Sequence, residues 1–188
     1  MKKIYFIRHA EPDRTVEDEF TRPLSFLGKE QAKQLALYLN DKAIDYIFCS
    51  PYLRTRQTAH YISEQVNVPV TEIFELHERI ISMEWISTLN FTEYSMKQWD
   101  NRDFKLDTGE SLSEALERFR SGLDKIRGIV ENESTVVIVT HATVISLFLN
   151  SLDSSYGFEK FQKMTTPDIY YVEINKANEG YVCKHIKM

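Results

Sequence analysis

Cysteine, glycine and excess positive charge are all scarce in this sequence. The 188 residues include two cysteines, Cys49 and Cys183, too few for a disulfide framework or a zinc cluster. The six glycines are scattered, which excludes a glycine-rich loop that cradles a nucleotide phosphate. A net charge of −5 argues against a general nucleic-acid binder and against binding to an anionic membrane surface.

Long hydrophobic runs are also missing. No apolar stretch approaches the roughly 18 residues that a membrane span requires. After Lys2 and Lys3, Arg8 ends the apolar run at four residues, whereas a signal peptide needs roughly 7–15. We therefore expect a cytoplasmic protein in a reducing compartment.

Strand-like and helix-like segments alternate along the chain. Hydrophobic residues at 43% and charged residues at 27% are globular values, and the length fits one domain over 1–188. The expected strands are 4–7, 45–50, 68–74, 135–140, 169–174 and 181–186, and the expected helices are 26–41, 52–66, 111–131 and 142–152. This order predicts an α/β fold, a three-layer α/β/α sandwich with a mostly parallel central sheet that a hairpin closes.

Charged and imidazole side chains follow three of these strands. Arg8 and His9 end the first, Arg54 follows the second, and His141 follows the strand at 135–140. Because ligands of parallel α/β sheets bind beyond the carboxyl ends of the strands, we expect these four side chains at one edge. Two guanidinium groups and two imidazoles form a receptor for a doubly charged oxyanion, most naturally phosphate.

Two other chemistries fit parts of the same motifs. A cysteine phosphatase needs an arginine six residues after the thiolate, but Thr55 stands there and Arg54 comes one residue early. Cys49 lies in a hydrophobic strand, which favours a buried, inert thiol. The His-x-Glu at 9–11 lacks the Pro-Cys-x-x-Cys partner of zinc deaminases, so we expect no metal site. The remaining histidines are assigned surface or structural roles: His60, His77 and His185.

Five segments resemble, in the same order, the motifs of the histidine phosphatase superfamily, also called the phosphoglycerate mutase-like family. The segments are FIRHAEPD, RPLSFLGKEQAKQLALYL, CSPYLRTRQTA, TGESLSEALERF and VVIVTHATVIS. They are similar to the family's Arg-His-Gly-Glu segment, its Leu-Thr-x-x-Gly-x-x-Gln-Ala helix start, its Ser-Pro-x-x-Arg-x-x-Gln-Thr-Ala segment, its Gly-Glu-Ser helix and its second histidine. Ala10 and Ala142 stand where the family commonly has glycine, and alanine is the smallest such change.

The resemblance implies a metal-independent phosphatase that needs no cofactor and acts on a small phosphorylated substrate. It implies that His9 is the nucleophile, which forms a phosphohistidine while a backbone carbonyl holds its other ring nitrogen. Arg8, Arg54 and His141 are then the phosphate pocket, with His141 also counted as catalytic. Ser25 reads first as a helix N-cap, and second as a phosphate contact.

The resemblance points to Glu78 as the general acid that protonates the leaving oxygen. The segment 80–87 lacks the two glycines that usually follow this acid in the family, so Glu75 and Glu84 stay open as alternatives. The stretch 77–107 has weak periodicity and reads as an insertion that covers the substrate. Its aromatic residues are expected to select the leaving group: Trp85, Phe91, Tyr94, Trp99 and Phe104.

Hydrolysis is expected rather than mutase-type phosphoryl transfer, which is the first alternative. A mutase has to retain a bisphosphorylated intermediate, and by resemblance the dedicated mutases have longer insertions. Here the insertion's cations do not outnumber its acids: Arg79, Lys97, Arg102 and Lys105 against Glu84, Glu93, Asp100, Asp103 and Asp107. A second alternative is a catalytically inactive phospho-ligand binding protein. The sequence leaves the physiological substrate and the oligomeric state open.

Overall fold

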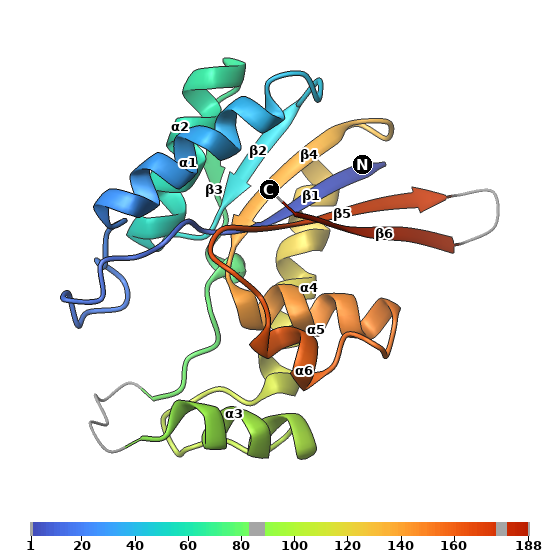
Figure 1. Ribbon diagram of the computed structural model, residues 1–188. Helices are drawn as coiled ribbons and strands as arrows, with labels where there is room; N and C mark the ends of the chain where they lie inside the picture. The colour runs from blue at the N-terminus through green and yellow to red at the C-terminus, as the bar shows by residue number, and fades with distance from the viewer. Residues whose placement is uncertain (1, 83–88, 176–179, 188) are drawn as a thin grey trace.

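Six strands form one mixed sheet in the computed structural model, which describes residues 2–82, 89–175 and 180–187 (Figure 1). The strands are β1 (Lys3–Arg8), β2 (Tyr46–Cys49), β3 (Val70–Glu72), β4 (Thr135–Thr140), β5 (Asp168–Asn175) and β6 (Gly180–Ile186). Their order across the sheet is β3-β2-β4-β1-β5-β6. The first four run parallel to one another, and β5 pairs antiparallel with both β1 and β6.

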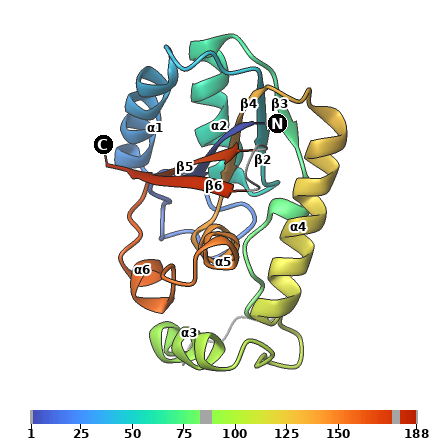
Figure 2. The ribbon, with the colours of Figure 1, turned by 90° about the vertical axis from the view of Figure 1, so that its right-hand side faces the viewer.

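Helices cover both faces of this sheet. The helices of the described residues are α1 (Phe26–Leu39), α2 (Leu53–Val66), α3 (Phe91–Asp100), α4 (Leu112–Ile129), α5 (Ala142–Leu152) and α6 (Phe158–Gln162), and α3 lies away from the sheet. Helices α1 and α2 lie on one face, and α4 and α5 lie on the other (Figures 1 and 2). The predicted three-layer α/β/α sandwich and its mostly parallel sheet are confirmed. None of the helices in the described part of the chain is long and apolar enough to cross a membrane.

The two central strands bury both of their faces. In β1, Ile4 and Phe6 pack toward α4 and α5, whereas Tyr5 and Ile7 pack toward α1 and α2. Strand β4 is buried along its whole length, as its uninterrupted apolar run predicts. Apolar burial on both faces therefore fixes the positions of the two strands whose ends carry His9 and His141.

The start of α1 packs closely against the loop that follows β1. Ser25 is the N-cap, and its hydroxyl accepts a hydrogen bond from the Gly28 backbone nitrogen at 2.9 Å. A Cβ atom at Gly28 would lie 2.0 Å from the Glu11 carbonyl oxygen, so only glycine permits this approach. Helix α1 thus holds in place the loop that follows His9.

Two helices were not anticipated, and two strands are shorter than expected: β2 lacks one residue at each end of 45–50, and β3 is shortened more. In α3 the buried residues are Tyr94, Ser95 and Gln98, so this helix lacks the apolar stripe that marks a helix in sequence. Helix α6 has five residues, too few to show a period. The strand expected at 68–74 covers Val70–Glu72, and a 3₁₀ turn, η1 (Phe74–Leu76), follows it.

Candidate active site

The carboxyl ends of β1, β2 and β4 lie next to one another in the sheet. His9 directly follows β1, and its backbone nitrogen donates to the Thr140 carbonyl oxygen at 3.0 Å. His141 follows β4 and precedes α5, while Arg54 lies in the first turn of α2, just after β2. The structure therefore brings the side chains of His9, Arg54 and His141 together, as the order of strand ends predicts.

The His9 imidazole is buried and held in one orientation. Its exposed fraction is 5%, and its Nδ1 lies 2.8 Å from the Ala10 carbonyl oxygen. A carbonyl oxygen accepts hydrogen bonds and cannot donate them, so Nδ1 carries the proton and Nε2 has the free lone pair. The Nε of Arg54 donates to that Nε2 at 3.0 Å. Nε2 is thus the ring nitrogen that faces the cationic group.

The Arg54 guanidinium connects both histidines with an acid from the loop before α1. Its Nη2 lies 3.3 Å from His141 Nδ1 and 3.1 Å from Glu19 Oε2. Its Nη1 donates to the Glu19 carbonyl oxygen at 2.5 Å. His141 Nε2 contacts the Ser50 hydroxyl at 2.7 Å. Glu19 was not predicted here, because a single acid in a polar loop is by default solvated.

Arg8 approaches the same strand ends from β1. Its Nη1 donates to the carbonyl oxygens of Met164 at 2.7 Å and Thr165 at 3.2 Å. Its Nε is buried and has no hydrogen-bond partner among the described residues. Burial lowers the pKa of Arg8, and Glu78 and Asp168 partly oppose that shift. The two carbonyl groups thus hold Nη1 of this guanidinium, and its Nε remains a buried donor without a partner among the described residues.

Burial keeps both site histidines neutral. It lowers the pKa of His9 and the pKa of His141 well below 6.5, and the Arg54 cation lowers both further. A neutral imidazole whose lone pair faces a guanidinium is suited to attack an anionic electrophile that the cation binds.

Glu78 is the acid that the structure places beside this cluster. It is half-buried, its Oε1 accepts from the Arg79 backbone nitrogen at 2.8 Å, and its Oε2 accepts from the Thr143 nitrogen at 3.3 Å. Of the two alternatives, Glu75 pairs with Lys125 of α4 at 2.5 Å. Glu84 lies outside the described residues.

Two cavities of about 230 Å³ each share Glu78, Phe91 and Thr143 in their walls. Arg8 lines one of them, and Glu19 and Tyr52 line the other. The described part of 77–107 thus borders the site. Among its aromatic residues, Phe91 lines both cavities, while Trp99 packs on Phe161 with ring centroids 5.8 Å apart. Trp85 lies outside the described residues.

Arg79 is a buried cation in the wall of one of these cavities. Its exposed fraction is 5%, and its guanidinium lies 5.7 Å from the Phe91 ring centroid and 5.5 Å from that of Tyr94. Its Nη1 donates to Gln98, a neutral partner, and its Nε has no hydrogen-bond partner in the described part of the chain. It forms no ion pair with any residue that the structure describes. From the sequence, Arg79 was counted only as one of the four cations of the insertion, and burial is what sets it apart.

Two further candidates occupy structural positions. The Ser25 hydroxyl caps α1, which is its first predicted role. Cys49 is buried at the end of β2, and burial raises the pKa of its thiol to about 12. Because a thiol with that pKa stays protonated at neutral pH, the cysteine phosphatase alternative loses its nucleophile. Within residues 2–82, 89–175 and 180–187, no group of three metal-ligating side chains is placed to hold an ion.

The overall fold is shared with solved structures of low sequence identity. The mycobacterial glucosyl-3-phosphoglycerate phosphatase superposes with a TM-score of 0.77 at 15% identity, covering 98% of this chain and 97% of that one. Phosphoserine phosphatase from Entamoeba histolytica gives a TM-score of 0.74 at 20% identity, covering 98% of this chain and 96% of that one.

Sequence relatives cover most of the chain. The protein named probable phosphoglycerate mutase GpmB from Serratia proteamaculans is 27% identical over 165 residues, which is 81% of this chain and 75% of the relative. Its namesake from Escherichia coli is 24% identical over 164 residues, with the same coverage. The family model for branch 1 of the histidine phosphatase superfamily matches residues 4–187, and the chain belongs to that superfamily.

Proposed function

We propose that this protein is a phosphatase that hydrolyses phosphomonoesters through a phosphohistidine on His9. One observation carries the proposal: the lone pair of a neutral, buried imidazole faces the guanidinium of Arg54. Arg8 and His141 complete a pocket for a phosphate dianion. The proposal includes a small phosphorylated substrate and a cytoplasmic location, and the net charge of −5 argues against nucleic acid and anionic membrane surfaces as partners.

In the first step the phosphate group binds to the two arginines, and Arg54 turns from His9 Nε2 toward the phosphate oxygens. Nε2 then attacks phosphorus, so that an N–P bond forms as the P–O bond to the alcohol breaks. The arginines stabilise the charge on the equatorial oxygens. Protonated Glu78 gives its proton to the leaving oxygen, and the alcohol departs.

In the second step water attacks the phosphorus of phosphohistidine. The Glu78 carboxylate accepts a proton from this water, the N–P bond breaks, and Nε2 recovers its lone pair. Inorganic phosphate leaves, and Arg54 returns to His9 and Glu19. The catalytic cycle returns the enzyme to its starting state, because Glu78 recovers from water the proton that it gave to the leaving group.

The leaving group is assigned to the cavities that Glu78 and Phe91 share. We infer that the insertion at 77–107 covers the substrate there, with Phe91 as its aromatic wall. Arg79 forms no ion pair with a described residue, and burial lowers the pKa of its guanidinium although the charges of Glu78 and Glu110 partly oppose that shift. This supports selection for alcohols that carry a negative charge.

Mutase-type transfer is the second candidate, because the two sequence relatives described above are named probable phosphoglycerate mutases. A mutase holds a second phosphate in the leaving-group site. In the cavity that Glu19 and Tyr52 line, the described residues include one cation, Arg79, and two acids, Glu19 and Glu78. This balance favours hydrolysis. Isomerisation of 3-phosphoglycerate that outruns phosphate release, with a trace of the 2,3-bisphosphate present, would reverse the assignment.

The test is hydrolysis of an aryl phosphate by the purified protein in the presence of EDTA. Turnover at an undiminished rate is expected, since arginines supply the positive charge. Loss of activity in EDTA that a divalent ion restores would contradict the mechanism. Phosphate binding without any turnover would instead identify the inactive phospho-ligand binder.

A further inference from the structure

Asp168 is a buried carboxylate that the proposed chemistry leaves without a role. It begins β5, its exposed fraction is 4%, and it stands opposite Arg8 in the pairing of β1 with β5. Removing a carboxylate from water is costly unless donors surround it. Its position beside a phosphate-pocket arginine therefore calls for a physical reason.

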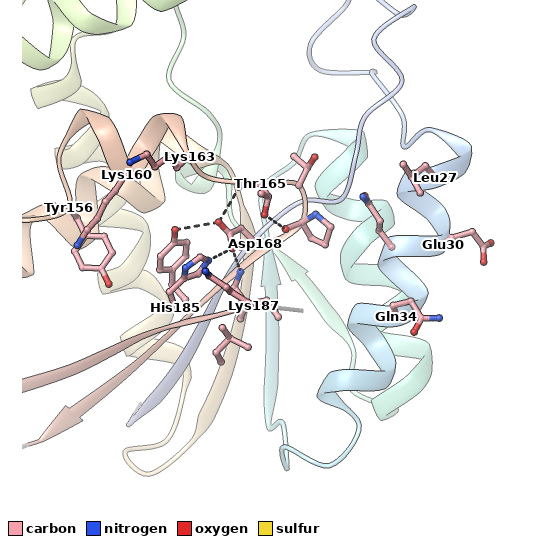
Figure 3. A pocket seen from close by; sticks show the side chains of 16 residues that line it. Leu27, Glu30, Gln34, Tyr156, Lys160, Lys163, Thr165, Asp168, His185 and Lys187 are labelled. Atoms are coloured by element: carbon pink, nitrogen blue, oxygen red, sulfur yellow. Dashed lines mark hydrogen bonds and ion pairs between the residues drawn. The ribbon is translucent and has the colours of Figure 1, made fainter.

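Four donors converge on this carboxylate (Figure 3). Oδ2 accepts from the Thr165 backbone nitrogen at 3.3 Å and from the Tyr170 hydroxyl at 3.3 Å. Oδ1 accepts from the Ile169 backbone nitrogen at 3.1 Å and from His185 Nε2 at 2.5 Å. Asp168 thus ties the segment 165–168 to both of the antiparallel strands.

The segment that Asp168 fastens also holds Arg8. The Thr165 nitrogen bonds Asp168, while the Thr165 and Met164 carbonyl oxygens accept the two hydrogen bonds of Arg8 Nη1. The negative charge of Asp168 also counters the effect of burial on the pKa of Arg8. Asp168 therefore acts on Arg8 in two ways, through the backbone it fixes and through its charge.

His185 closes the arrangement from the other side. Its ring stacks on Tyr170 with centroids 4.7 Å apart and planes 10° apart. It borders a cleft of about 890 Å³ between α1 and the segment 165–168 (Figure 3). Met164 instead lines the small cavity with Arg8, so the segment 164–168 separates this cleft from the proposed active site.

We propose that Asp168 and His185 are a positioning pair for Arg8, one that sets the affinity of the proposed phosphatase site for phosphate. His185 fixes the Asp168 carboxylate, Asp168 fixes the turn, and the turn carbonyls aim the Arg8 guanidinium. The inference rests on the proposed function only in assigning Arg8 to the phosphate pocket.

A positioning role predicts which kinetic constant changes. Arg8 contacts the phosphate group in the bound substrate and in the transition state alike, so a misplaced Arg8 raises KM more than it lowers kcat. Binding of inorganic phosphate weakens by a similar factor. A role confined to holding β5 in the sheet would lower thermal stability without this effect on the folded protein.

The experiment compares three variants of the full chain: Asp168→Asn, His185→Gln and the control Glu173→Gln. Glu173 is a carboxylate on the same strand that also accepts from a tyrosine hydroxyl, at 3.0 Å, but it pairs with Lys3 rather than Arg8. The dissociation constant of inorganic phosphate is measured by calorimetry, which needs no turnover, and KM and kcat are measured with an aryl phosphate. We expect Asp168→Asn to weaken phosphate binding about tenfold, as for loss of a hydrogen bond to a charged group. We expect His185→Gln to weaken it by a smaller factor, and Glu173→Gln to leave it unchanged.

Wild-type phosphate affinity in a folded Asp168→Asn protein, or equal losses in Glu173→Gln, would overturn the positioning role. If Asp168→Asn does not fold, His185→Gln decides, and wild-type affinity and KM in that protein overturn the proposal. If wild-type protein binds phosphate but hydrolyses nothing, the proposed function fails. The positioning role is then decided by the calorimetric dissociation constants of phosphate alone.

Discussion

Arg54 Nε and His9 Nε2 are joined by a hydrogen bond of 3.0 Å, so the proposed nucleophile is covered by the guanidinium that is proposed to bind the phosphate group. The same guanidinium also contacts Glu19 Oε2 at 3.1 Å. A phosphate dianion that draws Arg54 away from both partners exposes Nε2 as it binds. In the proposed mechanism, substrate binding and exposure of the nucleophile are therefore one event.

Arg54→Lys keeps the positive charge but removes the planar fork that bonds two phosphate oxygens at once. We expect kcat/KM for an aryl phosphate to fall by roughly 10²–10³, the usual effect of losing a preorganised donor. Arg56→Lys is the matched control, because Arg56 lies on the same helix, is exposed and pairs with Glu72 at 3.6 Å. Equal effects of the two substitutions would contradict the assignment.

Glu78→Gln removes the proton that the leaving alcohol needs. Alkyl phosphates, whose alcohols are poor leaving groups, should slow by roughly 10²–10⁴, whereas aryl phosphates need little protonation and should slow far less. Glu75→Gln, which alters an acid paired with Lys125, serves as the control. A uniform loss on both substrate classes would move the acid role to another carboxylate.

Arg79→Gln tests whether this buried cation binds a charge on the alcohol. The substrates are 3-phosphoglycerate and glycerol 3-phosphate, which differ by a carboxylate. Wild-type protein should prefer the former, and the variant should lose about tenfold of that preference in kcat/KM. Arg102→Gln is the control, since Arg102 lies over Trp99 and bonds Asn150. A preference unchanged in Arg79→Gln would assign selectivity to other residues.

The buried histidines predict how stability depends on pH. The pKa of His141 is far below 6.5 in the folded protein, while an unfolded histidine titrates near 6.5. Between these two values the unfolded chain binds a proton that the folded protein excludes, so stability falls as pH falls. The loss is up to about 1.4 kcal/mol per pH unit for this residue.

Urea unfolding at about pH 7 and about pH 5.5 measures that loss. In His141→Asn the decline should be shallower than in wild-type protein, whatever the variant's absolute stability. Identical declines would mean that His141 does not titrate differently on folding.

The layers of the fold could be predicted because buried strands and helices have recognisable patterns of apolar residues in the sequence. The residues 135–140 are uniformly apolar or β-branched and form a strand buried along its whole length. The helix at 111–131 shows its capping box from Ser111 to Glu114, and the structure forms it. Helix α3 was missed because its buried face includes Ser95 and Gln98, which carry no hydrophobic period.

The site residues that directly follow strands could be predicted from the sequence. The residues that reach the site through long-range polar contacts could not. His9, Arg54 and His141 follow strands, so topology alone brings them together. Glu19 and Asp168 are acids without a local motif, and their roles depend on contacts with Arg54 and with the turn that holds Arg8. His185 was assigned a surface or structural role, and its pairing with Asp168 had no local signal.

The central claim is a covalent phosphoryl group on His9, and rapid quenching tests it most directly. Wild-type protein mixed with a radiolabelled phosphomonoester and denatured within a turnover should carry label that acid removes and alkali does not, as for a phosphoramidate. His9→Ala should carry none and should lose several orders of magnitude in turnover. Label that persists in His9→Ala, or steady hydrolysis by that variant, would contradict the account.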